Sequence, residues 1–196
     1  MDERLPTVLV VTGPSGAGKG TLIRELVDRV PEIEVTVSAT TRAQRPGEED
    51  GREYWFLTDA DFLSRVAHGD FLEHVEYVSG RRYGTLRSEL ERIAGHGHVP
   101  LLELETEGAL RVKRQVVGAV TIFISARVEE LERRLRERAT ESTGEIGERI
   151  ALARKQLEQA DEFDYVIEND ELERAVEEMT AVVRGFLSPA ATMPRR

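Results

Sequence analysis

Apolar residues in this sequence alternate between two patterns. Short continuous runs, rich in β-branched residues, have the length of buried strands and occupy residues 8–12, 34–37, 99–105, 119–124 and 165–167. Between them, apolar residues recur every three or four positions, as on one face of a helix. Such helices are predicted after residue 19 and over residues 108–115, 128–139, 146–162 and 172–187. Strands that alternate with helices predict a parallel sheet covered on both faces, with the runs at Val8, Leu101, Ala119 and Tyr165 near its centre.

The region from Ser38 to about Ile93 breaks this rhythm and is predicted to be an inserted subdomain. Its opening stretch is polar, carries Pro and two Gly residues, and is expected to be a loop as far as Tyr54. A turn is predicted at residues 79–84, followed by a helix that Thr85 caps. Strands of this region are assigned to residues 54–57 and 71–78, and a helix between them to residues 58–68. A second polar break is expected at residues 140–147.

Length and charge narrow the range of functions. The 196 residues suit one compact domain with small insertions. The formal net charge of −10 is opposite to that of a duplex-binding surface, so no nucleic-acid partner is expected. The chain has no cysteine, which excludes disulfides and thiolate metal sites. No apolar run is long enough to span a membrane, and residues 2–4 are charged rather than signal-like, so we expect a cytoplasmic protein.

The first strand leads into a glycine-rich turn that predicts a phosphate-binding site. Residues 13–19 read G-P-S-G-A-G-K, and a helical pattern follows. Strand, glycine loop, Lys and helix together place backbone N–H groups and a helix N-terminus around an anion, with Lys19 as an added charge. The residue after the Lys, usually Ser or Thr, is Gly20. Thr21 does not replace it, because one residue rotates a side chain by about 100° around a helix.

A second candidate for phosphate binding lies in the polar stretch. Arg42 and Arg45 are three residues apart, and two guanidinium groups there can each hold a phosphate bidentately. Taken alone, such a pair is more simply read as two solvated surface arginines. The surrounding residues decide between the two readings.

From Gly13 to Asp170 the sequence resembles the guanylate kinase family. The glycine loop matches the family's G-P-S-G-x-G-K motif, and residues 38–54 match S-x-T-T-R-x-x-R-P-G-E-x-x-G-x-x-Y at every marked position. The motif at residues 38–54 is specific to far fewer families than the glycine loop, which many families share. Further matches are F-L-E at residues 71–73, Y-G-T at 83–85, an R-L-x-x-R lid motif at 134–138 and Y-V-I-x-N-D at 165–170.

The resemblance implies an α/β fold of the P-loop NTPase type, with three α/β/α layers around a central parallel sheet. It also implies an inserted α+β subdomain and a helical lid. The implied division is an ATP-binding core of residues 1–37, 95–126 and 158–187, a GMP-binding subdomain of residues 38–94, a lid of residues 127–157 and a disordered tail of residues 188–196.

The implied activity is that of an ATP:GMP phosphotransferase, which converts ATP and GMP into ADP and GDP. In this family, residues matching Arg42, Arg45, Tyr54 and Tyr83 hold the GMP phosphate, while those matching Ser38, Glu73 and Thr85 read guanine. Glu103 and Glu105 complete the GMP side. The implied ATP-binding residues are Asn169 and the loop residues Gly13, Pro14, Ser15, Gly16, Ala17, Gly18, Lys19, Gly20 and Thr21.

Catalysis in this reading consists of positioning and charge stabilisation. The implied catalytic residues are Lys19, Arg42, Arg134, Arg138 and Arg149. Arg134 and Arg138 are four residues apart and share one helix face, which can close over the transferred group. Mg²⁺ is the implied cofactor and has no firm protein ligand. It would be held through phosphates and water, with Thr21 and Glu105 as the candidate side chains.

Some positions depart from the family pattern. Besides Gly20, Glu105 stands where Asp is common, Glu107 where Gln is common, and Ala139 where the lid has Gly. Two alternatives stay open: a non-catalytic guanylate kinase-like binding module, and a related P-loop kinase for another phosphorylated small molecule. The glycine loop with its Lys disfavours the first, and the base-reading positions Ser38 and Glu73 disfavour the second. The sequence does not distinguish a monomer from a homo-oligomer.

Overall fold

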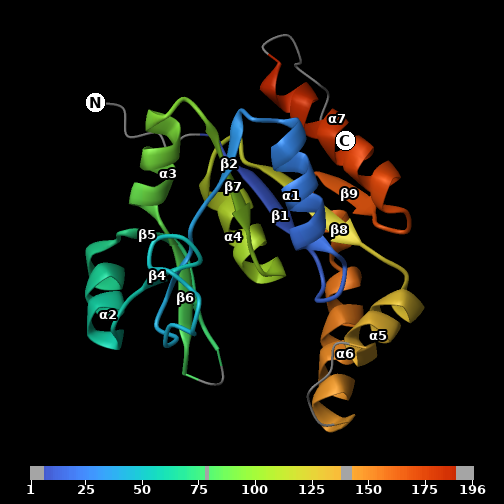
Figure 1. Cartoon of the computed structure of the whole chain (residues 1–196), viewed down its shortest axis with the longest axis horizontal. Coiled ribbons are helices and arrows are strands. Elements are labelled where there is room, and N and C mark those ends of the chain that lie inside the picture. Colours follow the sequence, from blue (N-terminus) through green and yellow to red (C-terminus); the bar gives the residue numbers. More distant parts are fainter. Residues whose placement is uncertain (1–6, 78–79, 138–142, 189–196) are drawn as a thin grey trace.

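Five parallel strands form the main sheet, and the strand that leads into the glycine loop lies at its centre (Figure 1). The computed structural model describes residues 7–77, 80–137 and 143–188. The strand order is β2-β7-β1-β8-β9, and every neighbouring pair is parallel, which confirms the predicted α/β fold. These strands are β1 (Leu9–Thr12), β2 (Ile33–Val35), β7 (Val99–Glu103), β8 (Val120–Ser125) and β9 (Tyr165–Glu168).

Helices cover both faces of this sheet, which explains why the central strand is an unbroken apolar run. Leu9 and Val11 point into one core, shared with α1 and α7. Val8 and Val10 point into a second core on the opposite face, shared with α3 and α4. Side chains alternate between the faces of a strand, so burial of both faces requires an apolar residue at every position. The helices are α1 (Lys19–Arg29), α3 (Arg87–Gly95), α4 (Thr106–Gln115) and α7 (Leu172–Leu187).

A second, four-stranded sheet stands beside the first (Figure 1). Its order is β4-β3-β6-β5, and it has its own small core, in which Phe62 stacks on Phe71 with ring centroids 4.4 Å apart. The hydroxyl oxygen of Thr58 accepts a hydrogen bond from the Asp61 N–H and caps the helix of this sheet. The elements are β3 (Ala39–Thr40), β4 (Trp55–Phe56), α2 (Asp59–His68), β5 (Phe71–Glu76) and β6 (Arg82–Leu86).

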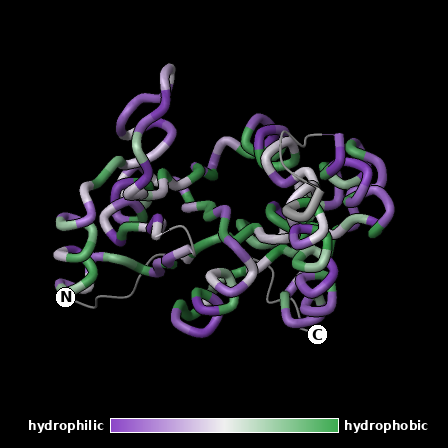
Figure 2. Tube along the Cα trace, turned by 90° about the horizontal axis from the view of Figure 1, so that it is seen from below, coloured by the Kyte–Doolittle hydropathy of each residue, from purple (hydrophilic) through white to green (hydrophobic). Residues whose placement is uncertain are grey.

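Two charged helices, α5 (Val128–Glu137) and α6 (Thr143–Leu157), form a pair that extends beyond the main sheet (Figure 1). Leu131 of α5 and Ala153 of α6 are buried in the core shared with α1. Arg154 donates a hydrogen bond to Glu132 at 2.6 Å across the pair. Hydrophobic and hydrophilic residues alternate within single helices along the whole trace (Figure 2), as expected of helices with one buried face. None of the described helices has the length and apolar composition needed to cross a membrane.

The largest difference from the sequence prediction concerns the second half of the small sheet. Residues 82–84 were predicted as part of a turn, but they belong to β6, which pairs antiparallel with β5. Thr85 is a strand residue opposite Glu73 rather than a helix cap, and α3 begins only at Arg87. Pairing with a distant strand overrides the local turn composition here.

Other differences are smaller. Two residues of the predicted loop, Ala39 and Thr40, form the short strand β3. Helix α6 begins at Thr143, inside the predicted polar break, and ends at Leu157, before the 3₁₀ turn η1 (Ala160–Glu162). Strand β9 lies at the sheet edge rather than near its centre, and its Tyr165 and Val166 are about 40% exposed. The predicted disordered tail falls, from residue 189 onward, outside the described residues.

Candidate nucleotide-binding and active site

The glycine loop is curled tightly between β1 and α1. Gly13, Gly16 and Gly18 have positive φ angles of 139°, 89° and 88°. At Gly13 a Cβ atom would lie 2.1 Å from the carbonyl oxygen of Ile124, so only glycine fits there. The loop thus holds an N-terminal helix turn and a set of backbone N–H groups at the carboxyl edge of the sheet, where parallel sheets bind ligands.

Lys19 is the first residue of α1 and folds back over the loop. Its Nζ donates hydrogen bonds to the carbonyl oxygens of Gly13 at 2.7 Å and Pro14 at 3.2 Å. Burial lowers the pKa of Lys19, and the nearby carboxylates of Glu103 and Glu105 counteract part of this shift. Arrival of an anion such as a phosphate would favour the charged ammonium further.

Two predicted residues from distant parts of the chain, Asn169 and Arg134, contact this loop. Asn169 is buried, and its Nδ2 donates to the Ala17 carbonyl oxygen at 2.7 Å. Arg134 of α5 donates through Nη1 to the Gly16 carbonyl oxygen at 3.1 Å, and its Nε pairs with Glu130 at 2.6 Å. Each of these contacts lies at the position that the motifs assign to the phosphate side.

The second helix of the pair also reaches the loop. Arg149 of α6 donates through Nη2 to the Ser15 hydroxyl oxygen at 3.0 Å. The structure therefore brings Arg134 and Arg149 together at the loop. Arg138 and Ala139 lie outside the described residues.

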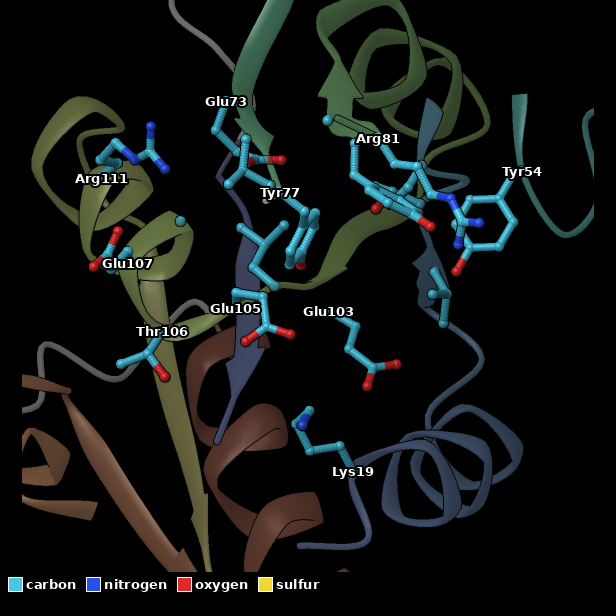
Figure 3. Close-up of a pocket in the computed structure, with 18 of the residues that line it drawn as sticks. Lys19, Tyr54, Glu73, Tyr77, Arg81, Glu103, Glu105, Thr106, Glu107 and Arg111 are labelled. Carbon is cyan, nitrogen blue, oxygen red and sulfur yellow. The ribbon is translucent and has the colours of Figure 1, made fainter. Parts of the chain in front are cut away.

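A cleft of about 920 Å³ lies between Lys19, at the end of the loop, and the small sheet (Figure 3). Lys19, Glu103 and Glu105 line its main-sheet side. The opposite wall comes from the small sheet and the chain that leads into it, and includes the predicted residues Ser38, Tyr54, Glu73 and Tyr83. Lys19, which the motifs assign to ATP, and the small-sheet residues, which they assign to GMP, thus face the same cleft.

Glu73, which lines this wall, is paired with the buried Thr85. They are opposite each other in the β5–β6 pairing, and the Thr85 hydroxyl donates to Glu73 Oε1 at 3.0 Å. Both side chains are buried, and burial raises the pKa of the Glu73 carboxyl. Helix α4 closes in from the other side, because a Cβ on Gly108 would lie 3.3 Å from Glu73 Oε2.

The two arginines of the polar loop behave differently from each other. Arg42 is only 8% exposed, lies over the ring of Tyr54 at 5.2 Å, and pairs through Nη2 with Glu48 Oε1 at 2.8 Å. Arg45 is exposed, and its backbone N–H donates to the other oxygen of Glu48 at 2.8 Å. The described residues that line the cleft include Tyr54 and Tyr83, whose rings meet edge to face, but neither arginine.

The two candidate metal ligands have protein partners. The hydroxyl oxygen of Thr21 accepts from Arg24 at 3.5 Å, and Glu105 Oε2 accepts from the amide of Gln156 at 3.3 Å. Within the described parts of the chain, no three His, Asp or Glu side chains are grouped so as to hold a metal ion.

Sequence reasoning missed several cleft residues. Three residues of α6, Leu152, Lys155 and Gln156, line the cleft, and Gln159, which follows the helix, lines it as well. The spacing of the three α6 residues places them on one helix face, so periodicity offered a signal, although the mixture of residue types concealed it. Arg81, which lines the cleft from the end of the β5–β6 hairpin (Figure 3), had no comparable signal. Glu48 is a marked position of the motif at residues 38–54, but the motif does not indicate that it holds Arg42.

The fold and the cleft define a P-loop phosphotransferase of the nucleoside monophosphate kinase class, with a phosphate loop and a second substrate site on facing walls. The family model for guanylate kinase matches residues 5–185. The chain therefore belongs to the guanylate kinase family, as its motifs predicted.

Individual relatives agree with this assignment. The chain is 47% identical to the guanylate kinase of Rubrobacter xylanophilus over 92% of its length and 95% of that protein. It is 46% identical to the guanylate kinase of Synechococcus sp. (strain JA-3-3Ab) over 90% of its length and 81% of that protein. The crystal structure of guanylate kinase from Anaplasma phagocytophilum superposes with a TM-score of 0.69 at 29% identity, covering 93% of this chain and 86% of the other.

The close approach at Gly13 gives a direct test of the loop geometry. We expect Gly13→Ala to lower the free energy of unfolding by more than the ~1–3 kcal/mol of backbone strain, because the new Cβ also meets the Ile124 carbonyl. Gly20→Ala is the matched control, since nothing lies within 4 Å of a Cβ there and the position is helical. It should leave stability unchanged or raise it by about 0.5–1 kcal/mol. Urea unfolding measures both, and equal curves would contradict the loop geometry.

Proposed function

We propose that the protein is a guanylate kinase that transfers the γ-phosphoryl group of ATP to GMP, giving ADP and GDP. The observation that carries the proposal is the buried Glu73–Thr85 pair, in which Glu73 lines the same cleft as Lys19 at the end of the glycine loop. A carboxylate in that place suits a base that offers two N–H donors. Both substrates and both products are nucleotides of the cytoplasm, which is where the proposal locates the enzyme.

Guanine recognition follows from the hydrogen-bonding capacity of the inner wall. Guanine offers N1–H and N2–H₂ as donors and O6 as an acceptor. The Glu73 carboxylate can accept from both donors, while the Ser38 hydroxyl can donate to O6 and the Thr85 hydroxyl holds the carboxylate that reads the base. Adenine presents the opposite pattern and would leave the buried carboxylate without donors, which costs free energy.

The GMP phosphate is assigned to Tyr54 and Tyr83, which line the same wall, and to Arg42 and Arg45 of the polar loop beside it. Arg42 lies over the ring of Tyr54, and its bonds to Glu48 and to the Ala43 carbonyl oxygen use only part of its five N–H donors. Glu48 therefore holds the guanidinium in place without occupying it fully. Arg45 is exposed and would reach the phosphate from the loop.

The ATP phosphates are assigned to the glycine loop, with Lys19 as the cation nearest the transferred group. Its Nζ now bonds two loop carbonyl oxygens and can exchange them for phosphate oxygens of higher charge. Arg134 and Arg149 approach from the helical pair of residues 127–157, which we propose acts as a lid, and Arg138 belongs to the same segment. The attacking GMP oxygen is already an anion, so no side-chain base is required.

Exclusion of water completes this mechanism. A closed lid keeps water away from the γ-phosphate, which would otherwise be lost to hydrolysis. We propose the lid, the ATP-binding core and the GMP-binding subdomain of residues 38–94 as separate functional units, because each supplies a different wall of the cleft.

The residues present fit Mg²⁺ held mainly by phosphates and water. Mg²⁺ prefers oxygen ligands and usually keeps several waters. Glu103 and Glu105 lie near Lys19 at the cleft, and the space beside Gly20 is open. Glu105 would accept hydrogen bonds from metal-bound water. Bound Mg²⁺ would neutralise charge on the β- and γ-phosphates.

A panel of nucleotide acceptors tests the proposal. With ATP as donor, GMP should be preferred over AMP by on the order of 10⁴-fold in kcat/KM, because AMP leaves Glu73 unpaired. UMP and CMP should be poor substrates as well. A coupled assay for ADP measures the turnover of each acceptor. Equal use of AMP would refute guanine recognition, and no turnover of any acceptor would favour the binding-module alternative.

Glu73→Gln separates substrate recognition from stability. The substitution should raise KM for GMP far more than KM for ATP, since only the guanine acceptor is lost. Burial raises the pKa of Glu73, so the folded protein binds this proton more tightly than the unfolded chain does. Proton binding to Glu73 therefore contributes to the free energy of unfolding at low pH, and this contribution is lost as pH rises through the raised pKa. At neutral pH, Glu73→Gln should therefore increase the free energy of unfolding, measured in urea.

The same shift predicts how GMP binding depends on pH. In the native protein, KM for GMP should rise as pH falls through the raised pKa of Glu73, at a higher pH than for an ordinary glutamate. In Glu73→Gln this part of the pH profile should disappear. A profile that is unchanged by the substitution would assign the titration to another group.

Gly20 offers a test of how the metal is held. Gly20→Ser has room for its side chain and restores a hydroxyl next to Lys19. We expect a lower Mg²⁺ concentration for half-maximal rate, because the hydroxyl can replace one metal-bound water. Gly20→Ala, which has the same backbone but no hydroxyl, is the control. Identical Mg²⁺ dependence of the two variants would show that the position does not reach the ion.

A further inference from the structure

A second buried carboxylate, Glu89, lies behind the cleft and belongs to neither substrate site. It is on α3, is 2% exposed, and is not among the residues that line the cleft. Glu89 Oε1 accepts from the backbone N–H of Val37 at 3.0 Å, and Oε2 accepts from the indole Nε1–H of Trp55 at 3.4 Å. Arg92, one turn further along α3, donates to both oxygens at 2.8 and 3.2 Å.

These partners come from different passages of the chain between the two sheets. Val37 lies in the segment that leaves β2 for the small sheet, and Trp55 lies on β4. Glu89 itself follows β6, where the chain returns to the main sheet through α3 (Figure 1). One carboxylate therefore joins the outgoing chain, the edge strand of the small sheet and the returning helix.

The network continues to the main sheet and to the cleft. Arg92 also pairs with Glu34 of β2 at 2.7 Å, which ties α3 to the edge of the main sheet. On the cleft side, the Ser38 carbonyl oxygen accepts from the Trp55 backbone N–H at 2.9 Å. Ser38 follows Val37 and Tyr54 precedes Trp55, and both Ser38 and Tyr54 line the cleft.

A buried carboxylate is costly unless its oxygens are paired. At Glu89 two donors are neutral groups of the small-sheet region and two belong to Arg92, so the charge is compensated and held from two sides. Loss of the carboxylate would release Val37 and Trp55 together.

We propose that Glu89 is a positioning residue for the GMP half of the cleft, fixing the 36–38 segment and β4 so that Ser38 and Tyr54 face the substrate. The inference rests on the proposed guanylate kinase activity. Glu89 contacts no substrate. Its effect is transmitted through the backbone of Val37 and through the indole of Trp55.

The kinetic test compares Glu89→Gln with Glu91→Gln, which makes the same charge change at an exposed position of the same helix. Each oxygen of Glu89 accepts from two donors, so in Glu89→Gln the side-chain NH₂ meets one N–H of Arg92 and that of either Val37 or Trp55. One contact to the small-sheet region therefore fails in either orientation. KM for GMP should rise about tenfold, corresponding to one charge-assisted hydrogen bond, while KM for ATP stays within about twofold. Glu91→Gln should match the native enzyme. Unchanged KM for GMP, or an equal rise in KM for ATP, overturns the proposal.

Trp55 supplies an independent readout, because it is the only tryptophan in the sequence. Its fluorescence emission should shift in Glu89→Gln and not in Glu91→Gln. Trp55→Phe, which keeps an aromatic ring and removes the donor, should also raise KM for GMP, and its effect should not add to that of Glu89→Gln. It also serves if Glu89→Gln does not fold, and unchanged KM for GMP in Trp55→Phe would then overturn the proposal. Failure of the native protein to phosphorylate GMP would instead refute the proposed function.

Discussion

The site depends on one close approach, that of the glycine loop to the end of β8. No side chain fits between Gly13 and the Ile124 carbonyl oxygen, so loop and strand are in backbone contact. Parallel pairing of β1 with β8 and with β7 brings all three strand ends to the same edge. Lys19, the carboxylates after β7 and Asn169 after β9 therefore converge without any of them being close in sequence.

The sequence predicted most of the main sheet, for a physical reason. A strand that is buried on both faces needs consecutive apolar residues, and residues 9–11 of β1, 101–102 of β7 and 122–124 of β8 satisfy this. The same reasoning misplaced β9. Tyr165, Val166 and Ile167 form an apolar run, but only Ile167 is fully buried, and Tyr165 and Val166 remain partly exposed at the sheet edge. A short apolar run indicates a strand, and it does not indicate how many neighbours the strand has.

The small sheet was harder to predict because its strands are short and their partners are distant. The motifs identified Glu73 and Thr85 as one functional pair, yet local signals placed Thr85 at a helix start. Only the β5–β6 register places the two side chains opposite each other. Partners such as Glu48 for Arg42 and Gln156 for Glu105 likewise arise from the folded geometry, since the spacing of neither pair is that of a regular element. The chemical roles of the site residues were thus easier to infer from the sequence than the contacts that these residues make.

Burial of a carboxylate costs free energy, and the two buried carboxylates Glu73 and Glu89 differ in how far the fold compensates this cost. Glu89 has four donors from surrounding groups, so its charge is compensated and the contacts can hold two chain passages in place. Glu73 has Thr85 as its hydrogen-bonding side chain among the described residues, and burial raises its pKa. Its incomplete pairing destabilises the free protein, and donors of the substrate can relieve it. A carboxylate that the fold fully pairs supports structure, whereas one that the fold leaves short of donors is available to select a ligand that brings them.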